Sequence, residues 1–252
     1  MFKEERQKEI LSIIKDSQSV SVKELSNQFN VSILTVRRDL DALFDKNLIQ
    51  RTHGGAIAKE SSILKEISFN EKDGINVVEK DRIAKVAIKF INSTDTVFID
   101  GGTTTIRVAR ELKNLKSIKV ITNSIKIAIE LSENDNVILL GGNVRFKSFN
   151  TVGALVLREL DNFYADKLIL AIDGIDFNNG LTTTELSESV IKNKMINRAK
   201  ETMVVADSSK IGKVGPFKVA PLTSVKRIIT DSNLSNEYIK NFETVGVELI
   251  IS

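Results

Sequence analysis

The sequence of 252 residues contains no cysteine and one histidine, His53. The lack of cysteine excludes disulfide bonds, thiolate metal sites and cysteine nucleophiles, and a lone histidine excludes a metal cluster built from histidines. We therefore expect no metal site. A chain free of cysteine is also compatible with a cytoplasmic protein, which is the location that we expect.

Two further kinds of signal are missing. No apolar run approaches the roughly 18 residues of a membrane span, and the charged stretch Lys3–Arg6 directly follows Met1-Phe2, so the sequence predicts neither a membrane span nor a signal peptide. No Gly-Lys-Ser/Thr follows a glycine loop, and no strand precedes a Gly-x-Gly-x-x-Gly motif. Nucleotide and dinucleotide binding are therefore disfavoured.

The composition that remains is that of a folded protein, with 42% hydrophobic residues and a length that suits one small and one larger domain. Its net charge of +3 gives little information about partners. Residues 1–58 contain nine Lys or Arg and eight Asp or Glu, a net of +1. A role in DNA binding must therefore depend on where the positive groups point.

The stretch Val31–Phe44 has the pattern of a DNA-recognition helix. Ser32 suits the N-cap, and apolar residues at positions 33, 36, 40, 43 and 44 form one stripe at helical spacing. The other side carries Leu34, Thr35 and Arg38, with Arg37 at the edge of the stripe. Arginine can bind guanine in the major groove, and methyl groups can contact thymine. The alternative is an ordinary amphipathic surface helix.

The flanking segments favour a winged helix-turn-helix over residues 1–58. A helix is expected over Phe2–Lys15, and the capping box of Ser21 and Glu24 begins a second helix that runs to about Phe29. A strand at 48–52, a turn at 53–55 and a return strand at 56–58 would form the wing. Arg51 and His53 could contact phosphates or the minor groove there, although His53 could equally be a turn residue without a ligand.

Residues 59–75 are interpreted as a linker, and residues 76–252 as a larger domain. A helix is expected to run to about Ile91, and from Thr96 short apolar runs alternate with helical segments. The expected strands are 97–99, 120–121, 137–140, 168–172, 203–206 and 228–229, and the expected helices are 106–115, 125–131, 155–160 and 187–199. This alternation predicts an α/β domain with a mostly parallel sheet.

Glycine, hydroxyl and amide side chains recur where these strands end, which is where parallel sheets bind ligands. Helix N-termini and an arginine there would suit the phosphate of a small polyhydroxylated ligand, and the hydroxyls would suit its sugar. The alternative is that each loop is only a tight strand-to-helix turn. The candidate residues are Asp100, Gly102, Thr103, Thr104, Thr105, Thr122, Asn123, Ser124, Gly142, Arg145, Asp173, Thr182, Glu188, Lys192 and Lys210.

The ordered set of motifs resembles the DeoR family of bacterial transcription regulators over essentially the whole chain. In the N-terminal half it comprises Glu5-Arg6…Ile10-Leu11, Val22…Leu25, Val31-Ser32-x-x-Thr35-Val36-Arg37-Arg38-Asp39-Leu40 and His53-Gly54-Gly55-Ala56. In the C-terminal half it comprises Ile99-Asp100-x-Gly102-Thr103-Thr104-Thr105, Thr122-Asn123-Ser124, Leu140-Gly141-Gly142-x-x-Arg145, Val152-Gly153, Asp173-Gly174-Ile175, Gly180-Leu181-Thr182-Thr183, Lys192 and Ala206-Asp207-Ser208-Ser209-Lys210.

This resemblance implies that Thr35, Arg37 and Arg38 face operator DNA. It also implies a C-terminal sensor of phosphorylated sugars, related in fold to ribose-5-phosphate isomerase and CoA transferases. Two positions depart from the family pattern: Gly101 stands where many members have alanine, and Thr184-Glu185-Leu186 replaces a proline-containing acidic turn. Both concern which sugar phosphate is bound.

Glu188 and Lys192 allow more than one interpretation. They could form a surface ion pair at i,i+4 spacing, contact a ligand, or serve an aldose–ketose isomerase as base and electrostatic partner. Lys210 could bind a phosphate or be a solvated loop residue. The attached DNA-binding domain favours a sensor without a catalytic role.

The expected function is a DNA-binding homo-oligomer that represses genes of sugar uptake or catabolism and responds to a sugar phosphate, with no cofactor. A two-fold dimer would contact two operator half-sites. The ligand would favour one arrangement of the DNA-binding domains. An architectural nucleic-acid binder whose C-terminal half only oligomerises is the remaining alternative, and it would respond to no ligand.

Overall fold

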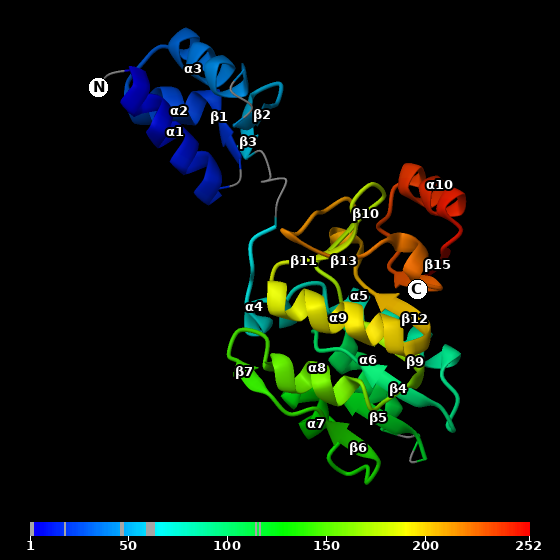
Figure 1. The fold of residues 1–252 in the computed structure, drawn as a ribbon. Coiled ribbons are helices and arrows are strands. Elements are labelled where there is room, and N and C mark those ends of the chain that lie inside the picture. Colours follow the sequence, from blue (N-terminus) through cyan, green and yellow to red (C-terminus); the bar gives the residue numbers. More distant parts are fainter. Residues whose placement is uncertain (1–2, 18, 46–47, 59–63, 114, 116) are drawn as a thin grey trace. The chain divides into compact units, whose positions relative to one another are not determined.

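The computed structural model describes residues 3–17, 19–45, 48–58, 64–113, 115 and 117–252. The chain divides into two compact units, residues 1–62 and residues 63–252, and Figure 1 labels the elements of each. Among the described residues, no helix has the length and apolar character needed to cross a membrane.

The N-terminal unit is a winged helix-turn-helix, as the sequence predicted. Its helices are α1 (Lys3–Ser17), α2 (Val22–Phe29) and α3 (Ile33–Asp45), and its sheet has the order β1 (Ser19–Ser21), β3 (Gly55–Ala58), β2 (Ile49–Arg51). Strand β1 was not expected, because three residues after a helix carry too short a pattern to reveal a strand. The core that holds the unit together consists of Ile10, Ile14, Val22, Leu25, Val36, Leu40, Leu43, Ile49 and Ala56.

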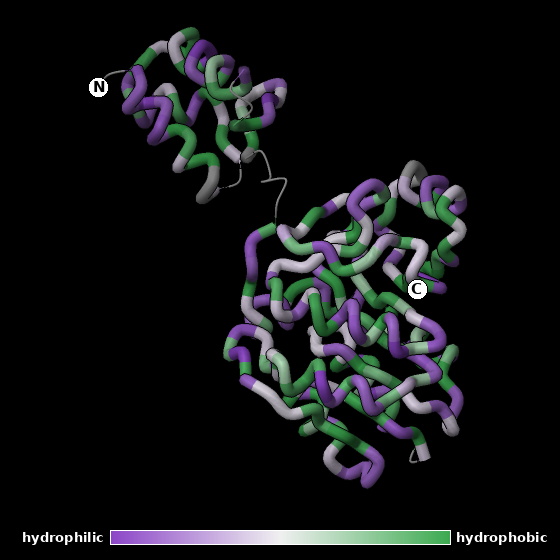
Figure 2. Tube along the Cα trace, viewed as in Figure 1, coloured by the Kyte–Doolittle hydropathy of each residue, from purple (hydrophilic) through white to green (hydrophobic). Residues whose placement is uncertain are grey.

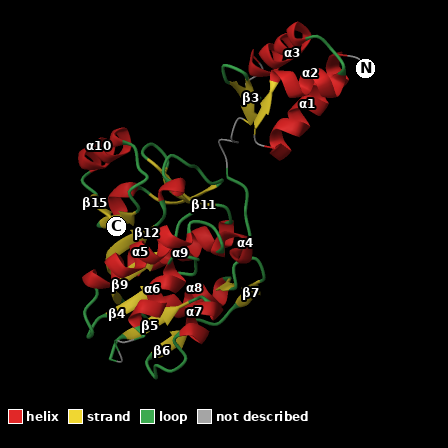
Figure 3. Cartoon of the chain, turned by 180° about the vertical axis from the view of Figure 1, so that it is seen from behind, coloured by secondary structure: helices red, strands yellow, loops and turns green. Residues whose placement is uncertain are grey.

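The larger unit is built on a seven-stranded sheet whose neighbouring strands are all parallel. Figure 3 shows this sheet from behind, with helices on either side of it. The strand order is β15 (Glu248–Ile251), β14 (Arg227–Thr230), β12 (Ala199–Val205), β9 (Ala165–Leu170), β4 (Thr96–Ile99), β5 (Lys119–Thr122), β6 (Val137–Leu139). The predicted α/β domain with a mostly parallel sheet is therefore confirmed.

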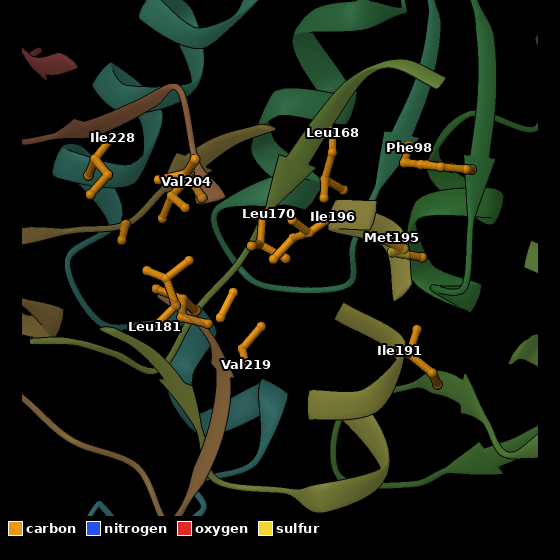
Figure 4. Packing of buried hydrophobic residues seen from close by; sticks show 14 of the residues in the cluster. Phe98, Leu168, Leu170, Leu181, Ile191, Met195, Ile196, Val204, Val219 and Ile228 are labelled. Carbon is orange, nitrogen blue, oxygen red and sulfur yellow. The ribbon is translucent and has the colours of Figure 1, made fainter. Parts of the chain in front are cut away.

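Each face of this sheet is covered by helices, because successive side chains of a buried strand point to opposite faces. Phe98, Leu168 and Leu170 pack against α8 (Ala154–Leu160), α9 (Leu186–Arg198) and α10 (Asn236–Val245), as Figure 4 shows for part of this cluster. Val97 and Ile169 pack against α5 (Val77–Ala87), α6 (Thr105–Leu112) and α7 (Ile125–Glu130). The strands are accordingly hydrophobic along much of their length (Figure 2).

Smaller elements lie outside the main sheet. They are a hairpin of β7 (Asn143–Arg145) and β8 (Asn150–Val152), a sheet of β10 (Gly174–Asp176), β11 (Gly180–Thr183) and β13 (Phe217–Ala220), and the short helices α4 (Phe69–Asp73), η1 (Ile88–Phe90), η2 (Ser208–Lys210) and η3 (Leu222–Ser224). Of these elements, only η1 was expected from the sequence. It continues α5 as the last part of the helix that we expected to run to about Ile91.

The structure differs from the expected linker 59–75. Residues 59–63 lie outside the described residues, and the stretch from Leu64 onward belongs to the larger unit. A capping box of Ser68 and Glu71 begins α4, and the Phe69 ring is buried. These interactions order a segment whose polar composition alone indicates a linker.

Strand order reverses between β4 and β9. From β4 the chain continues outward through β5 and β6, and then returns to place β9 on the other side of β4. Such a reversal leaves a crevice at the carboxyl ends of the two strands, because the connections that leave them diverge. This crevice positions the site described next.

Candidate functional site

The N-terminal end of α3 is exposed in the way that a recognition helix requires. The Oγ of Ser32 accepts a hydrogen bond from the Thr35 amide at 3.1 Å, which confirms the predicted N-cap. Leu34 is 58% exposed, and Arg37 and Arg38 are exposed as well. The surface thus presents two guanidinium groups beside an apolar contact and a hydroxyl.

The buried face of α3 differs from the predicted stripe at both ends. Ile33 and Phe44 are 48% and 50% exposed, because each lies at an end of the helix, beyond the residues that pack on α1 and α2. Asp39, which the apolar pattern omits, is buried in their place. It accepts hydrogen bonds from Arg6 Nε at 2.6 Å and Gln7 Nε2 at 3.0 Å, so this carboxylate joins α3 to α1.

The wing next to α3 has a defined geometry. Arg51 forms an ion pair with Asp41 of α3 at 3.2 Å, so its guanidinium is partly engaged within the protein, whereas His53 is exposed. A side chain at Gly55 would overlap the backbone of Val20 in β1, so glycine permits the close pairing of β1 and β3. A DNA contact by Arg51 or His53 stays a prediction.

A pocket lies at the carboxyl ends of β4, β9 and β12, at the point where strand order reverses. The loop after β4, the loop after β9 and the end of β12 form its floor, while segment 66–75, the β7–β8 hairpin and α9 form its walls. Its lining residues are Glu66, Ile67, Phe69, Lys72, Ile75, Lys80, Gly101, Gly102, Thr103, Thr104, Lys147, Ser148, Ala171, Ile172, Asp173, Thr184, Glu188, Lys192, Val205, Ala206, Asp207, Ser209 and Lys210.

Lysines dominate one part of this pocket. Lys80 is 3% exposed and donates a hydrogen bond to the Lys72 carbonyl oxygen at 2.6 Å. Burial, together with the nearby charges of Arg107 and Lys210, lowers the pKa of Lys80 to about 8, against the opposing effect of Asp207. Within the described residues, neither Lys80 nor Lys210 forms an ion pair with a carboxylate. Both ammonium groups are therefore available to an anion.

Backbone amides add to this positive region. Helix α6 begins immediately after the lining residues Gly101–Thr104, and because the Ile106 and Arg107 amides donate to the Gly102 and Thr104 carbonyls, the amides that could meet an anion are those of the loop itself. They carry a partial positive charge that favours an anion. The hydroxyls of Thr103 and Thr104 belong to the same loop.

Asp173 is held on the opposite side of the pocket by several donors. Lys72 Nζ lies 2.7 Å from its Oδ1, and the Thr183 hydroxyl and Thr184 amide donate to its Oδ2 at 2.8 and 3.1 Å. Burial favours the neutral acid, but the charge of Lys72 and these hydrogen bonds together hold the pKa of Asp173 well below its usual range. The group is a fixed carboxylate that can accept hydrogen bonds from hydroxyls.

Glu188 and Lys192 do not form the surface ion pair that their spacing allows. Lys192 is 3% exposed and pairs with Asp100, while Glu188 pairs with Arg145 at 3.0 Å. Burial raises the pKa of Asp100 to about 6 against the charge of Lys192, and the charges of Asp100 and Glu188 raise the pKa of Lys192 against its own burial. The side chains of Glu188 and Lys192 instead reach the pocket wall.

The structure sorts the predicted ligand residues into three groups. Gly102, Thr103, Thr104, Asp173, Glu188, Lys192 and Lys210 line the pocket. Asp100 and Arg145 lie one contact behind it, through Lys192 and Glu188. The remaining residues are absent from the lining: Thr105, Thr122, Asn123, Ser124, Gly142 and Thr182.

The residues of this last group contact other parts of the protein in the structure, and a ligand contact by any of them stays a prediction. The Thr105 hydroxyl donates to the Gly102 carbonyl, that of Thr122 to the Ile99 carbonyl, and that of Thr182 to the Gly174 carbonyl. Strand β8 covers the end of β5, where Thr151 and Asn150 contact the stretch that contains Asn123 and Ser124. Gly142 allows close packing, since a side chain there would meet the Val152 carbonyl oxygen at 2.7 Å.

Sequence reasoning missed several residues of the pocket. Lys72, Lys80, Lys147, Asp207 and Ser209 all line it. Lys72 and Lys80 precede the first strand of the domain, so a search limited to strand ends cannot find them. The Ser68-x-x-Glu71 capping box was the available signal that this segment is structured.

Fold and site together define a class of protein. One chain combines a winged helix-turn-helix unit with a doubly wound α/β unit, and a cation-lined pocket lies where the strand order of the α/β unit reverses. Comparison with known protein families identifies both units. The DeoR-like helix-turn-helix domain matches residues 6–62, and the DeoR C terminal sensor domain matches residues 75–232. The chain belongs to the DeoR family and is a DNA-binding transcriptional regulator, not an enzyme.

Known relatives match along nearly their whole length. An uncharacterized HTH-type transcriptional regulator of Bacillus subtilis (strain 168) is 39% identical over 254 residues, which cover 99% of this chain and 96% of that protein. The glycerol-3-phosphate regulon repressor of Escherichia coli (strain K12) is 32% identical over 92% of both chains. The lactose phosphotransferase system repressor of Lactococcus lactis subsp. lactis is 34% identical over 96% of both chains.

Among solved structures, ribose 5-phosphate isomerase A of Methanocaldococcus jannaschii matches 56% of this chain and 55% of its own, with a TM-score of 0.40 and 17% identity.

Proposed function

We propose that the protein represses genes for uptake or catabolism of a sugar, and that a phosphorylated sugar bound in the pocket controls its binding to operator DNA. Membership of the DeoR family supports the first part, as do relatives named as repressors of a glycerol-3-phosphate regulon and of a lactose phosphotransferase system. Such a protein acts in the cytoplasm, where the DNA is, and needs no cofactor.

In this proposal, residues 1–58 bind DNA, and the larger unit, which includes the stretch from Leu64 that we had expected to be a linker, binds the effector and forms the homo-oligomer. Helix α3 enters the major groove with Ser32, Leu34, Thr35, Arg37 and Arg38, and Arg51 and His53 of the wing contact the backbone or minor groove. The exposure of the two adjacent arginines at the start of α3 supports this assignment. A two-fold dimer would contact two half-sites.

An Arg38→Ala variant tests the DNA-binding assignment. A binding site selected by the wild-type protein from a random duplex library serves as the probe. We expect Arg38→Ala to lose specific binding and to unfold at the wild-type temperature, because its side chain is exposed. Lys8→Ala removes one exposed positive charge from α1 and is the matched control. Unchanged affinity in Arg38→Ala would contradict the assignment of α3.

The observation that carries the effector proposal is the pair Lys80 and Lys210, which face the pocket without a carboxylate partner among the described residues. A phosphate dianion between these lysines and the loop Gly101–Thr104 would gain charge-assisted hydrogen bonds. The carboxylates of Asp173 and Glu188 would accept hydrogen bonds from sugar hydroxyls. The remaining lining residues of the predicted set take part in the same site.

Thermal unfolding against a panel of sugar phosphates tests the effector proposal. A compound that binds only the folded protein raises the melting temperature by mass action. Each compound is compared with its unphosphorylated sugar and is recovered to confirm that it has not been converted. Lys80→Met should weaken the binding of an active compound roughly tenfold to a hundredfold, equivalent to one hydrogen bond to a charged group. If no phosphorylated compound shifts the melting temperature, the effector proposal fails.

A further inference from the structure

Segment 64–76 both connects to the N-terminal unit and lines the pocket. It follows the N-terminal unit, which ends at residue 62, and it forms one wall of the pocket through Glu66, Ile67, Phe69, Lys72 and Ile75. Whatever binds in the pocket therefore contacts the stretch of chain that leads to the DNA-binding domain. The inference below rests on the effector proposal and concerns how the same pocket is regulated.

Polar contacts provide most of the attachment of this segment. Only Phe69 among its larger apolar side chains is buried, while Ile67 and Ile75 are 44% and 50% exposed. Two backbone hydrogen bonds hold it, from the Leu64 amide to the Val214 carbonyl at 2.9 Å and from the Phe69 amide to the Lys147 carbonyl at 2.7 Å. Side-chain contacts add to these: the buried Arg107 donates to the Asp73 carboxylate at 2.6 Å, and the Asn76 amide group donates to Asp207 at 2.9 Å, so the attachment of the segment depends largely on polar groups.

Two of its ion pairs lie at the pocket and are partly open to water, whereas a third, between Asp73 and the buried Arg107, lies outside the pocket lining. Glu66 pairs with Arg145 at 2.8 Å, and Lys72 pairs with Asp173 at 2.7 Å. The four side chains keep between 16% and 24% of their surface exposed. Ion pairs of this kind contribute modestly and are sensitive to a neighbouring charge. The charge inside the pocket can therefore change how firmly the segment is attached.

Cations from two different parts of the structure meet in this pocket. Lys72 comes from segment 64–76, whereas Lys80 comes from α5 and Lys210 from η2. Lys72 is paired with Asp173, whereas Lys80 is close enough to the charge of Lys210 for its pKa to be lowered. An anion that contacts all three lysines would add an attraction between the segment and the rest of the domain. The ammonium of Lys72 has three donors, so it can bind an anion and keep Asp173.

We propose that Lys72 is an effector contact, and that a bound phosphate group holds segment 64–76 on the sensor domain by bridging Lys72 to Lys80 and Lys210. The ligand then favours the attached state of the segment by its differential affinity for that state. Because the segment leads to the DNA-binding unit, this is how the effector acts on DNA affinity. The thermodynamic coupling is reciprocal, so operator DNA changes effector affinity by the same factor.

Hydrogen–deuterium exchange of the full-length protein tests this inference, with inorganic phosphate as the probe and chloride at matched ionic strength as the reference. Phosphate binding is measured separately by calorimetry. If phosphate binds only the attached state, exchange of the Leu64 and Phe69 amides slows roughly tenfold when phosphate is at ten times its Kd. Peptides from strand β4, in the middle of the sheet, serve as the internal reference.

Three variants separate the role of Lys72 from a general effect of charge. Lys72→Met should bind phosphate more weakly and lose the protection of both amides even at saturation, whereas Lys72→Arg should keep it. Lys65→Met is the matched control, since Lys65 is an exposed lysine of the same stretch that does not line the pocket. The panel compound that shifts DNA affinity in the wild type should no longer do so in Lys72→Met.

The outcomes distinguish this inference from the effector proposal. If phosphate binds the wild type without slowing exchange, or protects Lys72→Met as well as the wild type, the inference is wrong and the effector proposal stands. If neither phosphate nor any sugar phosphate binds the wild type, both are wrong.

Discussion

Replacing Asp39 by alanine should unfold the DNA-binding unit without unfolding the sensor domain. Asp39 is 1% exposed, and its two hydrogen bonds from Arg6 and Gln7 join α3 to α1. Its removal leaves Arg6 buried without its carboxylate partner, which costs about 3–5 kcal/mol. At roughly 0.05–0.15 kcal/mol per residue, a unit of 62 residues has a stability of only about 3–9 kcal/mol. The substitution therefore removes from about a third to all of it.

Calorimetry of the full-length variant should show the transition of the N-terminal unit shifted to low temperature or absent, and the transition of the sensor domain unchanged. A double variant, Arg6→Met with Asp39→Leu, should recover part of the lost stability, because it removes both buried charges but leaves the Gln7 amide without its acceptor. DNA affinity should fall in Asp39→Ala and recover in the double variant. If Asp39→Ala costs less than about 1 kcal/mol, the value typical of an exposed pair, then the carboxylate is not buried against Arg6 and the packing of α1 on α3 is misassigned.

Three further results are expected from the sensor domain. Effector affinity should fall as the pH rises above about 8, because Lys80 loses its proton there. It should also fall as the pH drops below about 6, because a phosphate monoester then loses its second charge. In Lys80→Arg, titration calorimetry should show no decline at alkaline pH. Lys192→Met leaves Asp100 buried and unpaired and should cost about 3–5 kcal/mol in chemical denaturation at pH 8. Burial raises the pKa of Asp100 to about 6 even beside the charge of Lys192, and without the lysine the pKa is higher still, so this loss should shrink as the pH falls from 8 toward about 6; a loss independent of pH over that range would contradict the assignment. Gly101→Ala should destabilise the domain by about 1–3 kcal/mol, because the new methyl group would overlap the buried Asn150 side chain. Thermal unfolding of Gly101→Ala with and without Asn150→Ala would show whether that contact is the cause.

Periodic and local patterns predicted most of the fold. The capping box at Ser21 and the N-cap at Ser32 marked the starts of α2 and α3, and both are present. The alternation of buried strands and helices predicted the parallel sheet. Strand β1 has no strong local signal, because it forms through pairing with β3 more than thirty residues away, which no local pattern contains.

The candidate pocket was predictable only in part, because strand order decides which strand ends meet. The ends of β4 and β9 flank the reversal, so Gly102 and Asp173 come together there. The ends of β5 and β6 carry equally suggestive residues, such as Asn123, but lie farther along the sheet and are covered by β8. Lys72 was missed for the opposite reason, since nothing in the local sequence indicates that a segment before the first strand folds back over that crevice.

The pocket combines two kinds of parts, and this division has a consequence for engineering. Its floor belongs to the central strands of the sheet, whereas much of its wall belongs to segment 66–75 and to the hairpin residues Lys147 and Ser148, which are short surface additions. Grafting these two stretches from one family member onto another should transplant ligand preference while leaving the hydrophobic core of the recipient intact. Chimaeras of this kind would offer a short route to biosensors that report different metabolites through one operator.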